Sequence, residues 1–317
     1  MSDYYHQAEE VTIPTLNTLH LKQALAVKLD KVDYVLPSLP RGKVGLLSAA
    51  GGVGKSFWML QASLQIAACG YCDFDLAGVE FEKGDSRIGS VLIVSLEDES
   101  EDLSRRYQSI QRHWLNDAEK AEWITDIADN QLVELLPMAG QGITLINNNG
   151  EAKPWLDAIA SKAQSMHHCR LIVVDTLRRS HDCDENDNGV MSKVLRQFEI
   201  LAKNTGCSVL LLHHESKAAI QNSGAGAGAM RGASAIVDNA RWVMRMQRMT
   251  VNEAEQRGIV DNDIRKRWIR VTNEKANYGK EENEKWLYRG DTGVLVRKSP
   301  PAVQQQAARI GGRKRVG

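Results

Sequence analysis

The chain has 317 residues, and 40 Lys and Arg balance 40 Asp and Glu, so the formal net charge at pH 7 is +0. Net charge therefore does not indicate a polyanionic partner, and any basic surface must be local. No apolar run approaches the ~18 residues of a membrane span, and the N-terminus lacks the basic and apolar regions of a secretory signal. Five cysteines are an odd count that fits a reducing compartment. We expect a cytoplasmic protein with no membrane partner.

Residues 1–32 are expected to form an N-terminal arm. The apolar spacing over residues 16–28 predicts a short amphipathic helix. The arm could pack on its own domain or on a neighbouring subunit, and both alternatives stay open. In the segment that follows, Pro37 and Pro40 exclude the interior of a helix.

The next stretch has the pattern of a phosphate-binding loop. An apolar strand at residues 44–47 leads into a glycine-rich turn ending in Gly-Lys-Ser, and a helix-forming run at 57–68 follows. In such a loop, backbone N–H groups and a helix N-terminus surround phosphate oxygens. Lys55 is expected to reach the β- and γ-phosphates, and the Ser56 hydroxyl to bind Mg²⁺. Ala49 stands where the usual pattern has glycine. The predicted ATP-binding residues here are Gly51, Gly52, Val53, Gly54, Lys55, Ser56 and Phe57.

Three further apolar runs end in polar residues. They lie at 91–96, 171–174 and 208–212, and their composition is typical of strands buried on both faces. Functional groups of parallel sheets lie at the carboxyl ends of strands. There, Asp175 fits a Walker B acid that holds Mg²⁺ together with Ser56. Glu97 is expected to polarise the attacking water, with Asp98 and Glu99 as competing candidates.

Two histidines and one arginine complete the predicted chemistry. His213 and His214 end the third strand, where either could contact the γ-phosphate and couple it to the loop that follows. The alternative is that they are satisfied strand-end histidines. Arg231 ends that glycine-rich loop and fits an arginine finger supplied to a neighbouring subunit. Spacing alone does not select it among 40 basic residues.

The alternation of strands and helices predicts one three-layer α/β domain over residues 33–297, a P-loop NTPase fold with a mostly parallel sheet. Helices are expected at about 102–114, 118–129, 154–167 and 190–203. Strands at 132–136, 240–246 and 268–272 and a hairpin at 286–297 are also expected, the last as antiparallel additions at the C-terminal edge. Residues 298–317 are basic and expected to be disordered. That tail is either simply solvated or a weak nucleic-acid contact.

The chain resembles the plasmid RepA-type hexameric replicative DNA helicases, within the RecA/DnaB-like ATPases. The resemblance runs in order over nearly the whole chain. Its segments are Asp33-Tyr-Val-Leu-Pro, Gly51-Gly-Val-Gly-Lys-Ser, Glu97-Asp98, Val174-Asp-Thr-Leu-Arg-Arg, Asn204-Thr-Gly-Cys-Ser, Leu212-His-His-Glu-Ser-Lys, Arg231-Gly-Ala-Ser, Val237-Asp-Asn-Ala-Arg-Trp and Lys275-Ala-Asn-Tyr-Gly.

This resemblance implies a RecA-like fold and a homo-hexameric ring with ATP at the subunit interfaces. It implies Glu97 as catalytic base, His214, with or without His213, as γ-phosphate sensor, and Arg106 near the nucleotide. It further implies that Arg231 and Lys275 reach the neighbour's nucleotide. Loops 180–189 and 216–231 would line a channel for single-stranded DNA, with Lys217 and Arg179 as DNA-binding residues. A replication initiator or primase is the implied protein partner.

Two functions follow from these observations. The first is an ATP-hydrolysing, ring-forming helicase that translocates on single-stranded DNA in replication of a plasmid or phage-like element. The second is a non-translocating RecA-like ATPase that acts as a nucleotide-dependent regulatory or DNA-binding module in repair, recombination or mobile-element maintenance. The acidic loop 180–189 and the presence of only four Phe favour the second.

Overall fold

The computed structural model describes residues 17–68, 77, 89–215, 234–277 and 284–304. The chain divides into two units, Met1–Val32 and Asp33–Gly317. Within the first unit, α1 spans Leu21–Ala26 and its apolar side chains Leu21 and Leu25 are exposed. The helix is shorter than the predicted 16–28, because the backbone is already extended at Val27.

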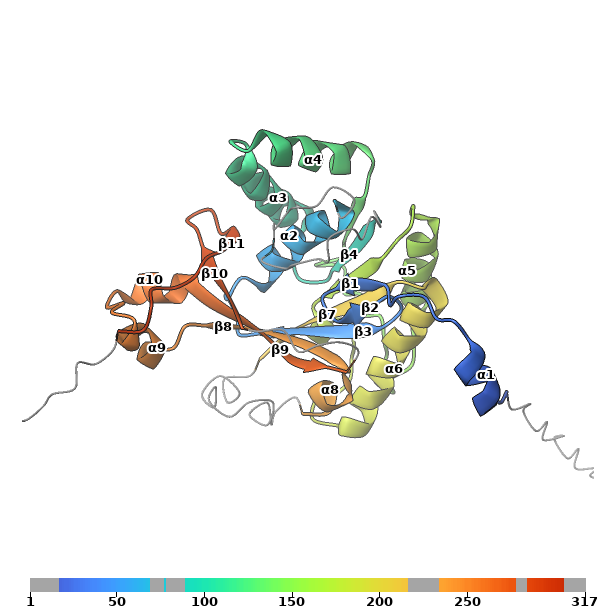
Figure 1. The fold of residues 1–317 in the computed structure, drawn as a ribbon. Coiled ribbons are helices and arrows are strands. Elements are labelled where there is room, and N and C mark those ends of the chain that lie inside the picture. The colour runs from blue at the N-terminus through green and yellow to red at the C-terminus, as the bar shows by residue number, and fades with distance from the viewer. Residues whose placement is uncertain (1–16, 69–76, 78–88, 216–233, 278–283, 305–317) are drawn as a thin grey trace, which may run out of the picture. The chain divides into compact units, whose positions relative to one another are not determined.

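A nine-stranded sheet forms the centre of the second unit (Figure 1). Its order is β11-β10-β9-β8-β3-β7-β6-β4-β5. The last six strands in this order, β8, β3, β7, β6, β4 and β5, pair in parallel. The remaining strands pair antiparallel beyond β8. The bounds are β3 (Val44–Ala49), β4 (Val91–Ser95), β5 (Val133–Pro137), β6 (Leu171–Asp175), β7 (Ser208–His214), β8 (Trp242–Arg248), β9 (Trp268–Ala276), β10 (Lys285–Arg289) and β11 (Leu295–Arg297). A separate hairpin joins β1 (Tyr34–Leu36) to β2 (Leu39–Pro40).

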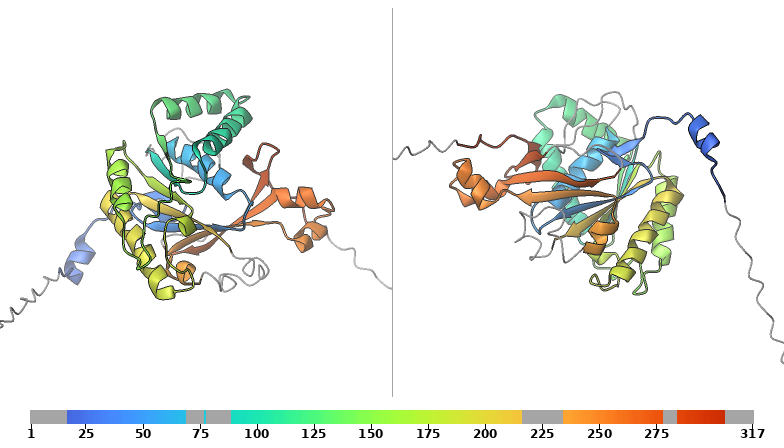
Figure 2. Two further views of the ribbon diagram at one scale, coloured as in Figure 1. Left: turned by 180° about the vertical axis from the view of Figure 1, so that it is seen from behind. Right: turned by 60° about the horizontal axis from the view of Figure 1, so that its bottom comes forward.

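Helices cover both faces of the sheet (Figure 1). One layer is α2 (Lys55–Ala67), α3 (Ser100–Trp114) and α4 (Ala118–Asp129). The other is α5 (Pro154–Ser165), α6 (Asn188–Thr205) and α8 (Ser234–Asn239). Two short helices, α9 (Val251–Gln256) and α10 (Asn262–Arg267), lie between β8 and β9 at the antiparallel edge (Figure 2). The predicted three-layer α/β fold, with antiparallel additions at the C-terminal edge, is therefore confirmed.

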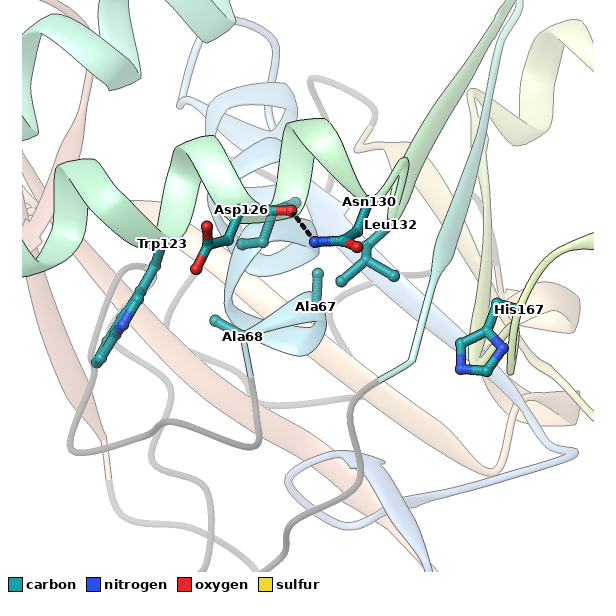
Figure 3. Close-up of a pocket in the computed structure, with 8 residues that line it drawn as sticks. Ala67, Ala68, Trp123, Asp126, Asn130, Leu132 and His167 are labelled. Atoms are coloured by element: carbon teal, nitrogen blue, oxygen red, sulfur yellow. Dashed lines mark hydrogen bonds between the residues drawn. The ribbon is translucent and has the colours of Figure 1, made fainter.

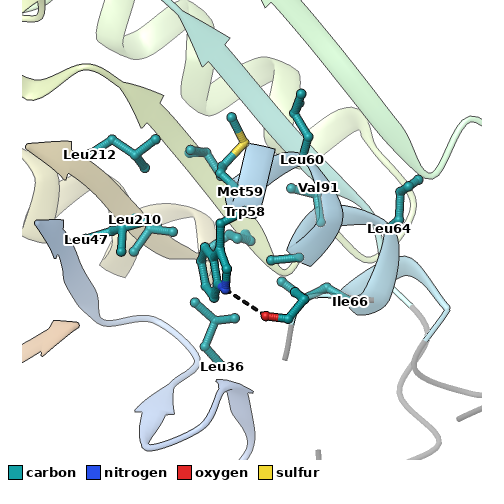
Figure 4. Packing of buried hydrophobic residues seen from close by; sticks show 14 of the residues in the cluster. Leu36, Leu47, Trp58, Met59, Leu60, Leu64, Ile66, Val91, Leu210 and Leu212 are labelled. Carbon is teal, nitrogen blue, oxygen red and sulfur yellow. Dashed lines mark hydrogen bonds between the residues drawn. The ribbon is translucent and has the colours of Figure 1, made fainter. Parts of the chain in front are cut away.

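The alternation of side chains along the buried strands produces two cores. On β4, Val91 and Ile93 belong to the cluster under α2, whereas Leu92 and Val94 belong to the cluster under α5 and α6. Figure 4 shows Trp58 of α2 among the leucines of β3 and β7, with its indole N–H donating to the Ala77 carbonyl at 2.9 Å. Because Trp58 is 1% exposed, its replacement by alanine is expected to cost about 3–5 kcal/mol.

The short helices α8, α9 and α10 were not predicted. Each has six residues, which is too few for a repeating 3.6-residue pattern to stand out. The helix predicted at 118–129 has the bounds of α4, whereas the helix predicted from 190 begins two residues earlier, where the Asp187 carboxylate caps it. In the part of the chain that the structure describes, no helix has the length and apolar character needed to cross a membrane.

Candidate active site

The carboxyl ends of four neighbouring parallel strands bring the predicted residues together. In the order β3, β7, β6 and β4, each strand is paired with the next. The phosphate loop follows β3, the two histidines end β7, Asp175 ends β6 and Glu97 follows β4. Groups from four separate parts of the sequence thus share one edge of the sheet.

The loop has the backbone of a phosphate cradle. Gly54, the N-cap of α2, has φ 117°, and Gly52 has φ 71°. Residues other than glycine rarely adopt such positive φ angles. Ala49, in contrast, is the last residue of β3, where the backbone is extended and glycine is not required. Phe57 is half-buried and packs against the core on the first turn of α2.

Lys55 is the first residue of α2 and is 4% exposed. Burial lowers the pKa of Lys55, whereas the negative charges of Asp175, Glu97 and Glu215 raise it by a smaller amount. Its Nζ has no hydrogen-bond partner among the described residues. A buried ammonium without a partner is costly, and a phosphate oxygen would satisfy it.

Ser56 and Asp175 form the predicted pair. The Ser56 hydroxyl donates to Asp175 Oδ2 at 3.1 Å, while Asp175 Oδ1 is buried and has no partner among the described residues. Burial raises the pKa of Asp175 to about 6, although Lys55 opposes the shift. A hydroxyl and a carboxylate beside a phosphate cradle are the donors that Mg²⁺ takes in such sites, so these residues fit the metal.

Glu97 has the contacts of an oriented carboxylate. Its Oε1 accepts from the Thr176 hydroxyl at 3.0 Å, and its Oε2 lies 3.4 Å from His214 Nε2. The hydrogen bond with His214 lowers the pKa of Glu97. Partial burial raises this pKa, and the hydrogen bond from Thr176 lowers it again, so that the net shift is downward. Glu97 is therefore ionised at neutral pH, as a general base must be.

Asp98 and Glu99, the other candidates for the catalytic base, have different contacts from Glu97. Arg106 forms a bidentate pair with Asp98, in which Nη2 lies 2.8 Å from Oδ1. The Asp98 carboxylate is thus occupied, and the Arg106 guanidinium predicted to lie near the nucleotide is held by it. Glu99 is exposed at the N-cap of α3.

The structure distinguishes the two histidines. His213 pairs with Ser48 inside the sheet and is 4% exposed, and burial lowers its pKa to about 4. His214 is one residue further along, with 42% of its side chain exposed and Glu97 as its neighbour. Only His214 therefore combines contact with the candidate base and access from outside.

A charged hollow of about 510 Å³ adjoins Glu97. Its lining residues are Glu97, Thr144, Arg178, Arg179, His181 and Asp182. Arg179 is exposed and its Nε lies 3.9 Å from Glu97 Oε1. The predicted loop 180–189 is anchored in the described structure, because Asp182 accepts from Thr144 at 2.8 Å and from Lys153 at 2.7 Å.

Lys275 is not at this edge. Lys275 pairs with Val243, which pairs in turn with Leu46 in the middle of β3, and its Nζ donates to the Val237 carbonyl at 3.5 Å. Lys217 and Arg231 lie outside the described residues. A separate hollow of about 390 Å³, between α4 and the last turn of α2, is at the far end of α2 from Lys55 (Figure 3).

Three sets of contacts were not predicted. Thr176 holds Glu97, and its place directly after Asp175 is the sequence signal for this contact. Arg248 and Arg289 both donate to the Gly52 carbonyl. Finally, Glu215 forms a buried bidentate pair with Arg245 and accepts from Ser48 on β3.

The comparison with protein families decides the identity of the domain. Residues 10–219, about two-thirds of the chain, match the model of the AAA domain. The chain belongs to the AAA domain family. It is thus a member of the P-loop ATPases, and the nucleotide-binding fold predicted from residues 51–56 is confirmed.

Solved structures of ATPases share the fold of this AAA domain protein. The ATPase domain of G40P has 13% sequence identity and a TM-score of 0.56, over 82% of this chain and 86% of its own. A DnaB-like replicative helicase, solved with attention to its interactions with primase, has 14% identity and a TM-score of 0.54, over 81% of this chain and 57% of its own. A KaiC-like protein from the archaeon Pyrococcus horikoshii has 13% identity and a TM-score of 0.51, over 86% and 100%. The RecA-like, DnaB-like fold predicted from the sequence is therefore confirmed.

Proposed function

We propose that this chain is an ATP-hydrolysing, ring-forming DNA helicase that translocates on single-stranded DNA, acting in replication of a plasmid or phage-like element. The observation that carries the proposal is the convergence of Lys55, the Ser56–Asp175 pair and the Glu97–His214 pair at one sheet edge. The similarity in fold to the G40P ATPase domain and the DnaB-like helicase supports it.

Each residue has a defined part in hydrolysis. Backbone N–H groups of residues 51–56 hold the β-phosphate, and Lys55 neutralises charge on the β- and γ-phosphates. Ser56 and Asp175 would hold Mg²⁺, which would neutralise charge on the phosphates. Glu97 orients the attacking water and accepts its proton, while Thr176 fixes the carboxylate.

His214 links this chemistry to the segment that follows it. Its ring reaches Glu97 from the end of β7, so a γ-phosphate beside Glu97 would also lie near His214. The next residue, Glu215, is fixed to Ser48 and Arg245. A change at the phosphate would therefore reach residues 216–231 through one rigid strand end. Lys217 and other residues of this segment would contact DNA. In a homo-hexamer, Arg231 and Lys275 would act on the neighbouring subunit's nucleotide.

A second function is favoured by the loop at 180–189. This loop is acidic and is held to the domain by Asp182, Thr144 and Lys153, which is unlike a mobile basic DNA contact. A non-translocating, nucleotide-dependent ATPase in repair, recombination or mobile-element maintenance would need no DNA channel. The similarity in fold to the KaiC-like protein is compatible with this function.

Strand displacement on a forked DNA substrate separates the two functions. The helicase proposal predicts ATP-dependent displacement by wild-type protein, loss of displacement in Lys55→Ala, and ATP turnover stimulated by single-stranded DNA. Native mass measured with ATP and Mg²⁺ should give a hexamer. ATP turnover that single-stranded DNA does not change, without displacement of a strand, would exclude the helicase and leave the second function.

A further inference from the structure

Two arginines converge on one carbonyl of the phosphate loop. Arg248 ends β8 and Arg289 ends β10, at the antiparallel edge of the sheet. Arg248 Nη2 donates to the Gly52 carbonyl at 2.7 Å, and Arg289 Nη1 donates to the same oxygen at 3.0 Å. A carbonyl oxygen has two lone pairs and can accept both bonds.

Neither arginine forms an ion pair with a carboxylate in the described part of the chain. Other arginines of these strands and their connections do: Arg245 pairs with Glu215, Arg267 with Asp291 and Arg270 with Glu253. Burial lowers the pKa of Arg289, and the neighbouring Arg248 cation lowers it further. Within the described part of the chain, two cations without a carboxylate partner are thus held against the loop, although like charges repel.

The hairpin that carries Arg289 is fixed to the phosphate-loop helix. Gln61 of α2 donates to the Leu295 carbonyl at 2.8 Å and accepts from the Leu295 amide at 2.9 Å. The Arg289 guanidinium lies 6.0 Å from the centre of the Phe57 ring. Gly293 leaves room for this ring, because a Cβ there would lie 2.7 Å from it. These contacts with α2 therefore fix the position of Arg289.

The geometry points to Arg248 and Arg289 as positioning residues, which hold the Gly52–Val53 peptide in its phosphate-binding orientation. In a trans peptide the C=O and N–H groups point in opposite directions. Because the arginines hold the Gly52 carbonyl, they also fix the direction of the Val53 N–H. The Val53 N–H donates to the Ala50 carbonyl at 3.4 Å, which is long for a hydrogen bond. A phosphate oxygen bound in the loop would replace this weak contact.

The inference rests on the proposed nucleotide site and has its own test. Binding of Mg-ADP and Mg-ATP is measured by titration calorimetry for wild-type protein, Arg248→Ala/Arg289→Ala, Arg248→Gln/Arg289→Gln and Arg267→Ala. Since the loop binds the β-phosphate, the double alanine variant should lose affinity for ADP and ATP alike, by at least about tenfold. The glutamine variant keeps neutral donors and should recover part of the loss. Arg267→Ala, which removes a partly exposed, ion-paired arginine of the same region, should bind like wild type.

Steady-state kinetics of ATP hydrolysis should agree with the binding measurements. The double alanine variant should raise KM for ATP and leave kcat at saturating ATP near the wild-type value, because Glu97 and Lys55 are untouched. Wild-type ADP affinity in the double alanine variant would overturn the inference, as would a loss confined to ATP, which would mean direct contact with the γ-phosphate. If wild-type protein bound neither nucleotide, the proposed function itself would fail. Circular dichroism of each variant separates loss of binding from loss of fold.

Discussion

The hydroxyl of Ser56 donates a hydrogen bond to Asp175 Oδ2 at 3.1 Å, although 119 residues separate the two along the chain. Ser56 opens α2, and Asp175 ends β6, which is separated from β3 by β7 in the sheet. The contact shows that the phosphate loop and the predicted Walker B acid share one site.

Lys55→Ala should weaken binding of ADP and ATP by at least about tenfold, because a hydrogen bond to a charged group contributes roughly 1.5–3 kcal/mol. The measurement is titration with a fluorescent ADP analogue. Lys203→Ala removes an exposed lysine of α6 and serves as the matched control. Equal affinity of Lys55→Ala and wild type would contradict the assignment of this lysine.

Arg245→Met should lower the free energy of unfolding by about 3 kcal/mol or more, since it leaves the buried carboxylate of Glu215 without its partner. Urea denaturation measures the change. Asp263→Asn breaks the exposed Lys266–Asp263 pair, and it should have no resolvable effect. If both variants unfold at the same urea concentration, the Arg245–Glu215 pair does not stabilise the strand ends.

Stability should decrease as the pH falls from about 6.5 towards 4. Burial lowers the pKa of His213 to about 4 and that of His181 to about 4, so the unfolded chain binds protons in this range that the folded chain does not. Asp175, whose pKa burial raises to about 6, acts in the opposite direction and offsets part of the loss.

The contribution of His213 can be isolated by substitution. His213→Gln should lose less stability between pH 7 and pH 5 than wild type, whereas His20→Gln, which changes an exposed histidine, should keep the wild-type loss. Urea denaturation at each pH is the measurement. Identical slopes for His213→Gln and wild type would mean that His213 is not held neutral in the folded protein.

Arg231→Ala should keep ATP binding and lose turnover if this arginine acts on the neighbouring subunit's nucleotide. Mixing Arg231→Ala with Glu97→Gln subunits tests this, because some interfaces would then combine an intact Glu97 with an intact Arg231. Partial recovery of ATP turnover at intermediate mixing ratios is the expected result. No recovery at any ratio would count against action across the interface.

The residues at the strand ends were predictable because the chain alternates buried strands with helices. Parallel strands place their carboxyl ends at one edge, so Glu97, Asp175 and His214 could be assigned to one site from the sequence alone. The period of two along a strand places His213 and His214 on opposite sides. The sequence does not say which side faces Glu97, and the pairing of β7 beside β6 decides it.

The contacts of Arg248 and Arg289 could not be predicted in the same way. Their meeting point on Gly52 depends on the antiparallel register of β8, β9 and β10 and on the packing of β11 against α2. No short motif encodes that register. The chain has 40 basic residues, and nothing in the local sequence distinguishes these two from the others.

Release of inorganic phosphate from ATP by wild-type protein and by Glu97→Gln, with Mg²⁺ and single-stranded DNA present, tests the central claim most directly. Wild-type protein should hydrolyse ATP. Glu97→Gln should bind ATP with wild-type affinity and release phosphate about 10²–10⁴-fold more slowly, since it keeps the shape of the side chain and removes the base. Glu99→Gln, at the neighbouring exposed acid, should hydrolyse ATP at the wild-type rate. Phosphate release by Glu97→Gln at the wild-type rate would contradict the account.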